Sequence, residues 1–247
     1  MNGIRRSIEL FRAFRHEATD PATFYRLLAD DTVSDVAKFC QLYGATVLDV
    51  GGASGYVAEA FRNVGARAIT AEYDVDQTTE HGRTLVGGII ADGCALPIAT
   101  GSVDVCYSSN VLEHVVSYQR MLSEMVRVVS PGGVIYVTFT NWLSPWGGHE
   151  TSPWHYGGGE WAARRFERTT GSPPKNNFGT SLFNLSVGEV LRWTKSSSDV
   201  EVLDTFPRYY PRWTKWIVTV PGVREFVTWN LVVVMRRKGS ASSELTR

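Results

Sequence analysis

Short apolar runs alternate with longer amphipathic stretches between about residues 46 and 140. Five runs have the length and β-branched content of buried strands: TVLDV (46–50), RAITAE (67–72), GGIIAD (87–92), VDVCYSS (103–109) and GGVIYVTFT (132–140). The stretches between them have helical spacing, as in SYQRMLSEMVRVVSPGG, where one apolar face contains Met121, Leu122, Met125, Val126 and Val129. This alternation predicts an α/β fold with a mostly parallel sheet and helices on both faces.

The regular alternation stops after Thr140. Residues 141–183 hold Trp142, Trp146, Trp154 and Trp161, a GG, a GGG and two histidines. A loop this long is usually functional or disordered, and its aromatic content argues against disorder. Beyond it, SVGEVLRWTKSS predicts a helix, and DVEVLDTF and TWNLVVVMRR predict two strands that we expect to form an antiparallel edge pair.

The length of 247 residues fits one large domain. We divide it into N-terminal helices that cover a cofactor site (1–44), a cofactor-binding core (45–140), a substrate insertion (141–183), a C-terminal helix with antiparallel edge strands (184–238) and a disordered tail (239–247). The 25 basic and 25 acidic residues cancel, which argues against nucleic acid as a partner.

Cysteine usage and hydropathy bear on the compartment. Cys40, Cys94 and Cys106 form no CxxC pair, which indicates a reducing environment and no cysteine-based zinc site. The N-terminal segment lacks the apolar core of a signal peptide, and no run approaches the ~20 apolar residues of a membrane span. These patterns predict a cytoplasmic protein.

The stretch GATVLDVGGASGY (44–56) predicts a strand that ends in a glycine turn before a helix. Such a turn offers backbone N–H groups to an anionic or polar ligand and allows it to come close. A dinucleotide fingerprint, G-x-G-x-x-G counted from Gly51, would need glycine at Ala53 and at Tyr56. The turn therefore fits a dinucleotide poorly.

The residues DVGGASG resemble the acid-x-G-x-G-x-G motif of class I S-adenosylmethionine-dependent methyltransferases, with Ala53 in place of the middle glycine. Later pieces follow in the order of that family: AEYD with Glu72, then ADGCALPIATGSVDVCYSS with Asp92, then VLEHV, which is typical of the type 11 subgroup. The resemblance covers residues 45–140, and the full chain looks like actinobacterial members of the subgroup.

The resemblance implies a Rossmann-like sheet of seven mostly parallel strands whose last strand is antiparallel, with S-adenosyl-L-methionine as cofactor. It implies that Glu72 accepts hydrogen bonds from the ribose and Asp92 from the adenine amino group. Ile98 and Val103 replace phenylalanines of the family pattern, so the adenine pocket wall is expected to differ. The cofactor site is predicted to comprise Asp49, Gly51, Gly52, Ala53, Gly55, Glu72, Tyr73, Asp92, Gly93, Ser109, Asn110 and His114.

Two histidines of the insertion are candidate catalytic residues. An imidazole takes a hydroxyl proton near neutral pH, and we favour His149, which follows paired glycines, over His155 as this base. The alternative is that both histidines cap the loop or stack on its tryptophans. A metal bound by His149, Glu150 and His155 is not expected, because their spacing is not helical and no acidic cluster follows the fourth strand.

Two segments have both apolar and basic residues. In IRRSIELFRAFRHE, Arg5, Arg12 and Arg15 flank an apolar helix face, which predicts a helix that packs across the cofactor or, alternatively, contacts an anionic membrane. The connection RYYPRWTKWIVTVPGVREF suits a membrane interface, a substrate cleft or a dimer contact. Peripheral membrane contact and the oligomeric state stay open at this point.

The combined patterns predict an S-adenosylmethionine-dependent methyltransferase that is cytoplasmic or peripheral at the membrane. Tryptophan and tyrosine faces stack well on sugar rings and other rings, so we expect O-methylation of a small-molecule, glycan or lipid-linked acceptor. Two alternatives remain: an NAD-dependent oxidoreductase, and a non-catalytic module that binds a nucleotide or a membrane.

Overall fold

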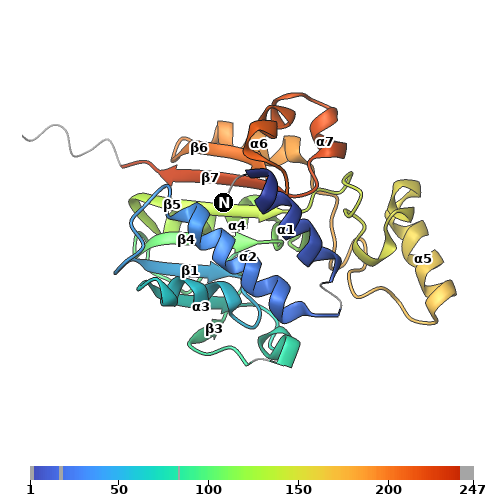
Figure 1. Ribbon diagram of the computed structural model, residues 1–247, viewed down its shortest axis with the longest axis horizontal. Helices are drawn as coiled ribbons and strands as arrows, with labels where there is room; N and C mark the ends of the chain where they lie inside the picture. The colour runs from blue at the N-terminus through green and yellow to red at the C-terminus, as the bar shows by residue number, and fades with distance from the viewer. Residues whose placement is uncertain (1–2, 17–18, 83, 240–247) are drawn as a thin grey trace, which may run out of the picture.

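The computed structural model describes residues 3–16, 19–82 and 84–239. Seven strands form one sheet in the order β3-β2-β1-β4-β5-β7-β6 (Figure 1). The first five strands run parallel: β1 (Thr46–Val50), β2 (Arg67–Glu72), β3 (Gly88–Ile90), β4 (Val103–Ser109) and β5 (Val129–Phe139). They confirm the predicted Rossmann-like α/β class, and the parallel strands bring their carboxyl ends to one edge of the sheet.

The last strand, β7 (Leu231–Arg237), runs antiparallel to both of its neighbours, β5 and β6 (Val200–Pro207). The prediction of an antiparallel last strand is confirmed, but β7 lies inside the sheet, and of this antiparallel pair β6 forms the edge. The apolar residues of β7, from Leu231 to Met235, are fully buried, as expected for a strand covered on both faces.

Successive side chains of each strand point to opposite faces, so the two faces have separate cores. Val47 of β1 packs with α2 (Pro21–Val36) and α3 (Tyr56–Asn63), whereas its neighbour Leu48 packs with α4 (Tyr118–Val128) and α6 (Val187–Ser196). Helices therefore cover both faces, as the alternating pattern predicts (Figure 1).

The insertion after β5 is more regular than expected. It contains the short turns η3 (His149–Thr151) and η4 (Trp154–Gly157) and a helix, α5 (Gly159–Thr170), which lies away from the sheet in Figure 1. The expectation of irregular structure is wrong over α5. That helix buries only Gly159 and Ala162, so no continuous apolar stripe announces it in the sequence.

The N-terminal helix α1 (Gly3–Arg15) packs on α2 through its buried Leu10. Arg6 of α1 holds the carboxylate of Asp31 on α2 with two hydrogen bonds of 2.5 Å. Four further elements complete the described chain: η1 (Asp76–Gly82), η2 (Leu112–His114), and, between β6 and β7, η5 (Arg212–Thr219) and α7 (Val223–Val227).

Two sequence predictions concern the ends and the membrane. The predicted disordered tail lies, from residue 240 onward, outside the described residues. Among the residues that the structure describes, no helix is both long and apolar enough to cross a membrane.

Candidate active site

A cavity of about 1180 Å³ opens at the carboxyl ends of β1, β2 and β4. All of the predicted cofactor residues line it except Gly55. Tyr25 and Leu28 of α2 also line it, whereas no residue of α1 does. Ligands of open α/β sheets bind at this edge, so the position agrees with that of a cofactor site.

The glycine turn after β1 leaves no room for side chains. A Cβ on Gly51 would lie 2.3 Å from a methyl group of Val111, and one on Gly52 would lie 2.2 Å from the Oδ2 atom of Asp49. Ala53, where the family motif has a glycine, has a left-handed φ of 44°. Gly55, with a φ of 80°, is the N-cap of α3 and turns the chain into that helix.

Glu72 fastens this turn to the end of β2. Its carboxylate accepts the backbone N–H of Ala53 at 2.8 Å, and those of Tyr73 and Asp74 at 2.8 and 3.1 Å. Burial and the nearby Glu72 carboxylate raise the pKa of Asp49, which lies beneath the turn, to about 7. The ribose contact predicted for Glu72 therefore adds to a structural role that the sequence did not suggest.

The remaining predicted cofactor residues follow β3 and β4. Asp92 accepts the backbone N–H of Cys94 at 2.7 Å, which orders the loop where the adenine is expected. Asn110 has a left-handed φ of 54°, and its Oδ1 atom accepts a hydrogen bond from Asn230 at 2.6 Å. Both loops are thus held by bonds to the protein.

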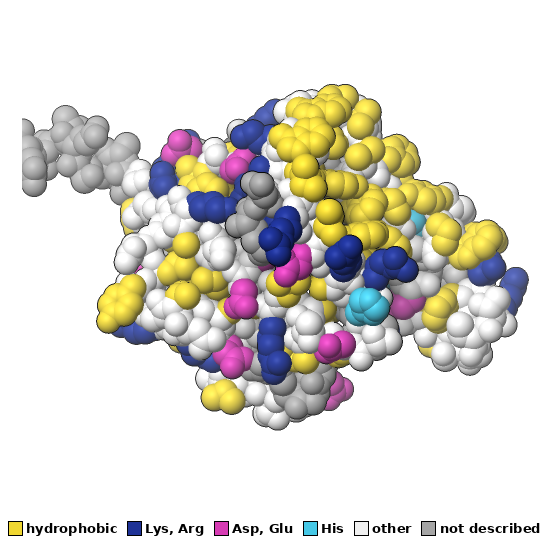
Figure 2. Space-filling view, viewed as in Figure 1, with side chains coloured by type: hydrophobic (Ala, Val, Ile, Leu, Met, Phe, Trp, Pro, Cys, Tyr) yellow, Lys and Arg dark blue, Asp and Glu magenta, His cyan; other side chains and the backbone are white. Residues whose placement is uncertain are grey.

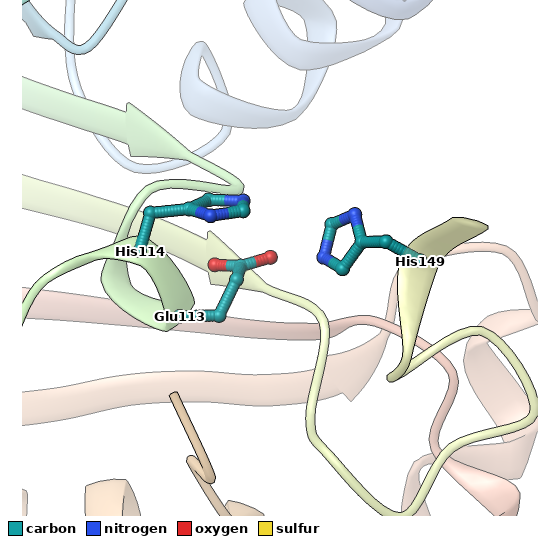
Figure 3. Close-up of side chains that lie close together, drawn as sticks. All are labelled: Glu113, His114 and His149. Carbon is teal, nitrogen blue, oxygen red and sulfur yellow. The ribbon is translucent and has the colours of Figure 1, made fainter. Parts of the chain in front are cut away.

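A cluster of three ionisable side chains, Glu113, His114 and His149, lies beside the cavity (Figure 3). His114 lines the cavity, and the ring of His149 lies 5.0 Å from it, centroid to centroid. His149 does not line the cavity itself. Burial, with the neighbouring His114, lowers the pKa of His149 to about 4, and burial raises the pKa of Glu113.

The trio considered for a metal in the sequence does not come together. Glu150 accepts a hydrogen bond from Asn176 at 2.8 Å, and His155 is buried, with its Nε2 atom 3.1 Å from the carbonyl oxygen of Ser144. His155 does not line the cavity, and its contacts suit a residue that holds the loop together.

The paired glycines before His149 pack closely against other parts of the insertion. A Cβ on Gly147 would lie 2.0 Å from the carbonyl oxygen of Trp142, and one on Gly148 would lie 2.5 Å from the ring of His155. The argument that these glycines admit substrate beside His149 is therefore not supported by the contacts of Gly147 and Gly148.

Comparison with known proteins decides the family. A family model described as a methyltransferase domain, of type 11, matches residues 48–137. The chain is 45% identical over 242 residues to a protein named as an uncharacterized methyltransferase from Mycobacterium tuberculosis, with 94% of each chain covered. The chain belongs to the class I methyltransferases of type 11. It is an enzyme whose cofactor is S-adenosylmethionine.

Solved structures of methyltransferases have the same fold. An S-adenosylmethionine-dependent methyltransferase from Mesorhizobium loti superimposes with a TM-score of 0.57 at 17% identity, covering 84% of this chain and 98% of that one. Magnesium protoporphyrin IX methyltransferase from Synechocystis, solved with bound S-adenosylhomocysteine, gives 0.52 at 13% identity, covering 86% and 83%. Family membership decides against the NAD-dependent oxidoreductase and the non-catalytic module.

The cavity of this methyltransferase fits its cofactor, because Gly51 and Gly52 place backbone without side chains in the wall beside β1, where a polar ligand can approach closely. Sequence reasoning missed other parts of the wall, which come from the insertion: Lys175, Asn176, Thr180 and Ser181. It also missed Glu113, although the pattern VLEHV contains it. No local spacing signals that a residue beyond β4 meets one beyond β5.

Proposed function

We propose that this methyltransferase transfers the methyl group to a hydroxyl oxygen of a lipid-linked acceptor at the surface of an anionic membrane. The observation that supports the acceptor class is a continuous exposed apolar surface beside the insertion (Figure 2). We call it the apolar patch. It comprises Ile4, Ile8 and Phe11 of α1, Trp213 and Trp216 of η5, and Val223, Phe226 and Val227 of α7.

The side chains of the apolar patch are unusually exposed for their size. Trp213 is 70% and Trp216 is 55% exposed, and Ile4 of α1 is 59% exposed. Ile4, Ile8 and Phe11 have the spacing of one helix face, yet this face points outward, while Leu10 on the other side of α1 packs on α2. Large contiguous apolar surfaces of this kind mark binding to a membrane or to another protein.

The charge around the patch favours an anionic membrane as the partner. Arg5, Arg12 and Arg15 of α1 are exposed beside it, and basic side chains gather along its border in Figure 2. Each arginine near an anionic bilayer surface contributes ~1 kcal/mol, and tryptophans such as Trp213 favour the headgroup level.

The apolar patch is continuous with the insertion. Phe14 of α1 packs edge-on against Trp146 of the insertion, with ring centroids 5.4 Å apart, and Trp146 packs against Trp229 at 6.2 Å. Another part of the insertion, including Ser181, lines the cavity, so the insertion contacts both the apolar patch and the cofactor cavity, as an acceptor held at the membrane would require.

Methyl transfer to a hydroxyl requires the protein to align the acceptor with the methyl group and to remove one proton. The cofactor supplies a methyl group that is already activated, and alignment of the acceptor contributes up to ~7–11 kcal/mol. Removal of the hydroxyl proton typically adds ~10²–10⁴-fold in rate. We retain the prediction that His149 serves this step, through its contact with His114 at the cavity wall. The variant His149→Ala should lower kcat while the affinity for S-adenosylhomocysteine stays unchanged.

Vesicle flotation tests the membrane part of this proposal. The wild-type protein should float with vesicles of phosphatidylcholine and phosphatidylglycerol at low salt, and less with phosphatidylcholine alone, because arginine attraction needs anionic lipid. The double variant Trp213→Ser, Trp216→Ser should lose flotation. A matched control is Trp154→Ser, Trp161→Ser, which removes two tryptophans of the insertion that are 47% and 45% exposed.

Two results would overturn the membrane assignment. One is equal flotation of both double variants. The other is a wild-type dimer in solution that becomes monomeric when Trp213 and Trp216 are replaced, since the apolar patch would then be a contact between two copies of the chain. If water-soluble hydroxyl compounds are methylated at the same rate with and without vesicles, the methyltransferase assignment stands and the proposal of a lipid-linked acceptor is refuted.

A further inference from the structure

Three side chains from two different segments converge beside the cavity (Figure 3). Glu113 and His114 belong to η2, which follows β4, and His149 begins η3, beyond β5. One nitrogen or oxygen atom from each lies within 4.8 Å of the others. Since β4 and β5 are neighbours in the sheet, their carboxyl ends bring these residues together across 35 residues of sequence.

The hydrogen bonds of the cluster leave two of its buried polar atoms without a partner among the described residues. The Nδ1 atom of His114 lies 2.5 Å from the carbonyl oxygen of Ser181. A carbonyl only accepts, so Nδ1 carries the hydrogen, and in the neutral imidazole Nε2 has the lone pair. Glu113 accepts the backbone N–H of Thr140 at 2.8 Å through Oε1. Its Oε2 atom, like the Nε2 atom of His149, is buried without a hydrogen-bond partner among the described residues.

A cation would satisfy all of these atoms at once. Glu113 is 1% exposed, and a buried polar atom without a partner costs about 1–3 kcal/mol. Histidines that bind metals usually donate their other N–H to a backbone carbonyl or a carboxylate, as His114 does to Ser181. The bond from Thr140 orients the Glu113 carboxylate in the same way. The cluster thus has outer contacts of the kind that support metal ligands.

The ligand types select the class of metal. Two imidazoles and one carboxylate suit zinc and the neighbouring transition metals, whereas magnesium and calcium prefer oxygen ligands. With metal–ligand bonds of ~2.0–2.2 Å, neighbouring ligand atoms lie roughly 3.4 Å apart. The separation of up to 4.8 Å between these atoms would therefore have to shorten by up to about 1.4 Å when an ion binds.

We propose that Glu113, His114 and His149 bind one divalent transition-metal ion, Zn²⁺ or an ion with the same ligand preference, with a coordination position open to the cavity. The evidence for metal binding comes from the three side chains alone, whereas the role given to the metal depends on the proposed function. An acceptor hydroxyl at the open position would lose its proton to water more easily. In the metal-bound protein His149 would therefore assist this step as a metal ligand and not as the base itself. The oxygen lone pair then forms the O–CH₃ bond, and the electrons of the broken S–CH₃ bond stay on sulfur, which becomes a neutral thioether.

Metal titration of the whole chain, with any histidine tag removed, tests the site. After treatment with a chelator, the wild-type protein should bind one Co²⁺ or Zn²⁺ per chain by mass spectrometry of the metal, and Co²⁺ should give a visible d–d spectrum. Glu113→Gln and His149→Ala should weaken binding by at least ~100-fold, because even outer contacts of metal sites contribute ~10–100-fold. The control Glu150→Gln, one residue from His149, should bind like the wild type.

The outcomes separate this site from the function it serves. A wild-type protein that binds no metal, or a Glu113→Gln variant that binds as tightly as Glu150→Gln, overturns the proposal. Calorimetric binding of S-adenosylhomocysteine shows which variants are folded. If both variants are unfolded, metal binding by the wild-type protein alone decides the proposal. If the protein transfers methyl groups to a hydroxyl without a bound metal, the role of the metal is refuted and the proposed function stands. If it binds the metal but transfers to no hydroxyl, the proposed function is refuted and the metal site stands.

Discussion

Replacement of Asp49 by asparagine should change how the stability of this protein depends on pH. Asp49 is 1% exposed, and burial together with the Glu72 carboxylate raises its pKa to about 7. In an unfolded chain the pKa of an aspartate is ~3.9. Between these two values the folded protein keeps a proton that the unfolded chain has lost.

The magnitude follows from the difference between these two pKa values. Each pKa unit corresponds to ~1.4 kcal/mol, so about three units give a ceiling of about 4 kcal/mol. In this pH range the folded state binds more protons than the unfolded chain. The contribution of Asp49 to the free energy of unfolding therefore falls as pH rises from about 4 to about 7. Below this window the penalty is absent, and above it the penalty is complete. Asparagine has no proton to lose.

Urea unfolding of the wild-type protein and Asp49→Asn, measured between about pH 4 and pH 8, isolates this effect. Other titrating groups, such as the salt-bridged Asp35, contribute equally to both proteins. The free energy of unfolding of the variant, relative to the wild type, should therefore rise by up to about 4 kcal/mol across the window. Parallel curves for the two proteins would refute the argument that Asp49 is buried beside a charged Glu72.

Three further predictions concern the turn. Glu72→Gln replaces one acceptor oxygen with an amide donor that faces backbone N–H groups, and charge-assisted bonds are worth ~1.5–3 kcal/mol, so S-adenosylhomocysteine should bind ~10–100-fold more weakly by calorimetry. Unchanged affinity would contradict this. Ala53→Gly should unfold at the same or slightly higher urea concentration, because a left-handed alanine costs ~1–2 kcal/mol and glycine loses ~0.5–1 kcal/mol to chain entropy. Gly52→Ala should lose cofactor binding, since its Cβ would meet Asp49; a variant that binds normally would contradict the packing.

The cofactor cavity was largely predictable because its residues act locally. Asp49, Gly51 and Glu72 lie at strand ends that the apolar pattern locates, and parallel strands must bring such ends together. The left-handed φ of Ala53 is a conformation that favours glycine, the residue of the family motif at this position, but it does not prevent the fold.

The acceptor side was less predictable because it depends on the path of the insertion. The pairing of Glu113 with His149 joins two segments through a loop whose route no periodicity encodes, and His149 itself adopts a left-handed φ of 49°. Likewise, position 147 requires glycine because any side chain there would meet the backbone carbonyl of Trp142, and this contact exists only in the folded protein. The helix α5 was not predicted because it buries only Gly159 and Ala162 and therefore needs no apolar stripe.

The most direct test of the central claim is the fate of a labelled methyl group. The enzyme, incubated with S-adenosylmethionine labelled in its methyl group and a total lipid extract of a Mycobacterium species in anionic vesicles, should place the label in a product that extracts into organic solvent. An ether on a former hydroxyl survives mild base, so the label should stay in that product after alkaline treatment. Label found only in protein or nucleic acid, or released by mild base, would contradict methylation of a lipid-linked hydroxyl.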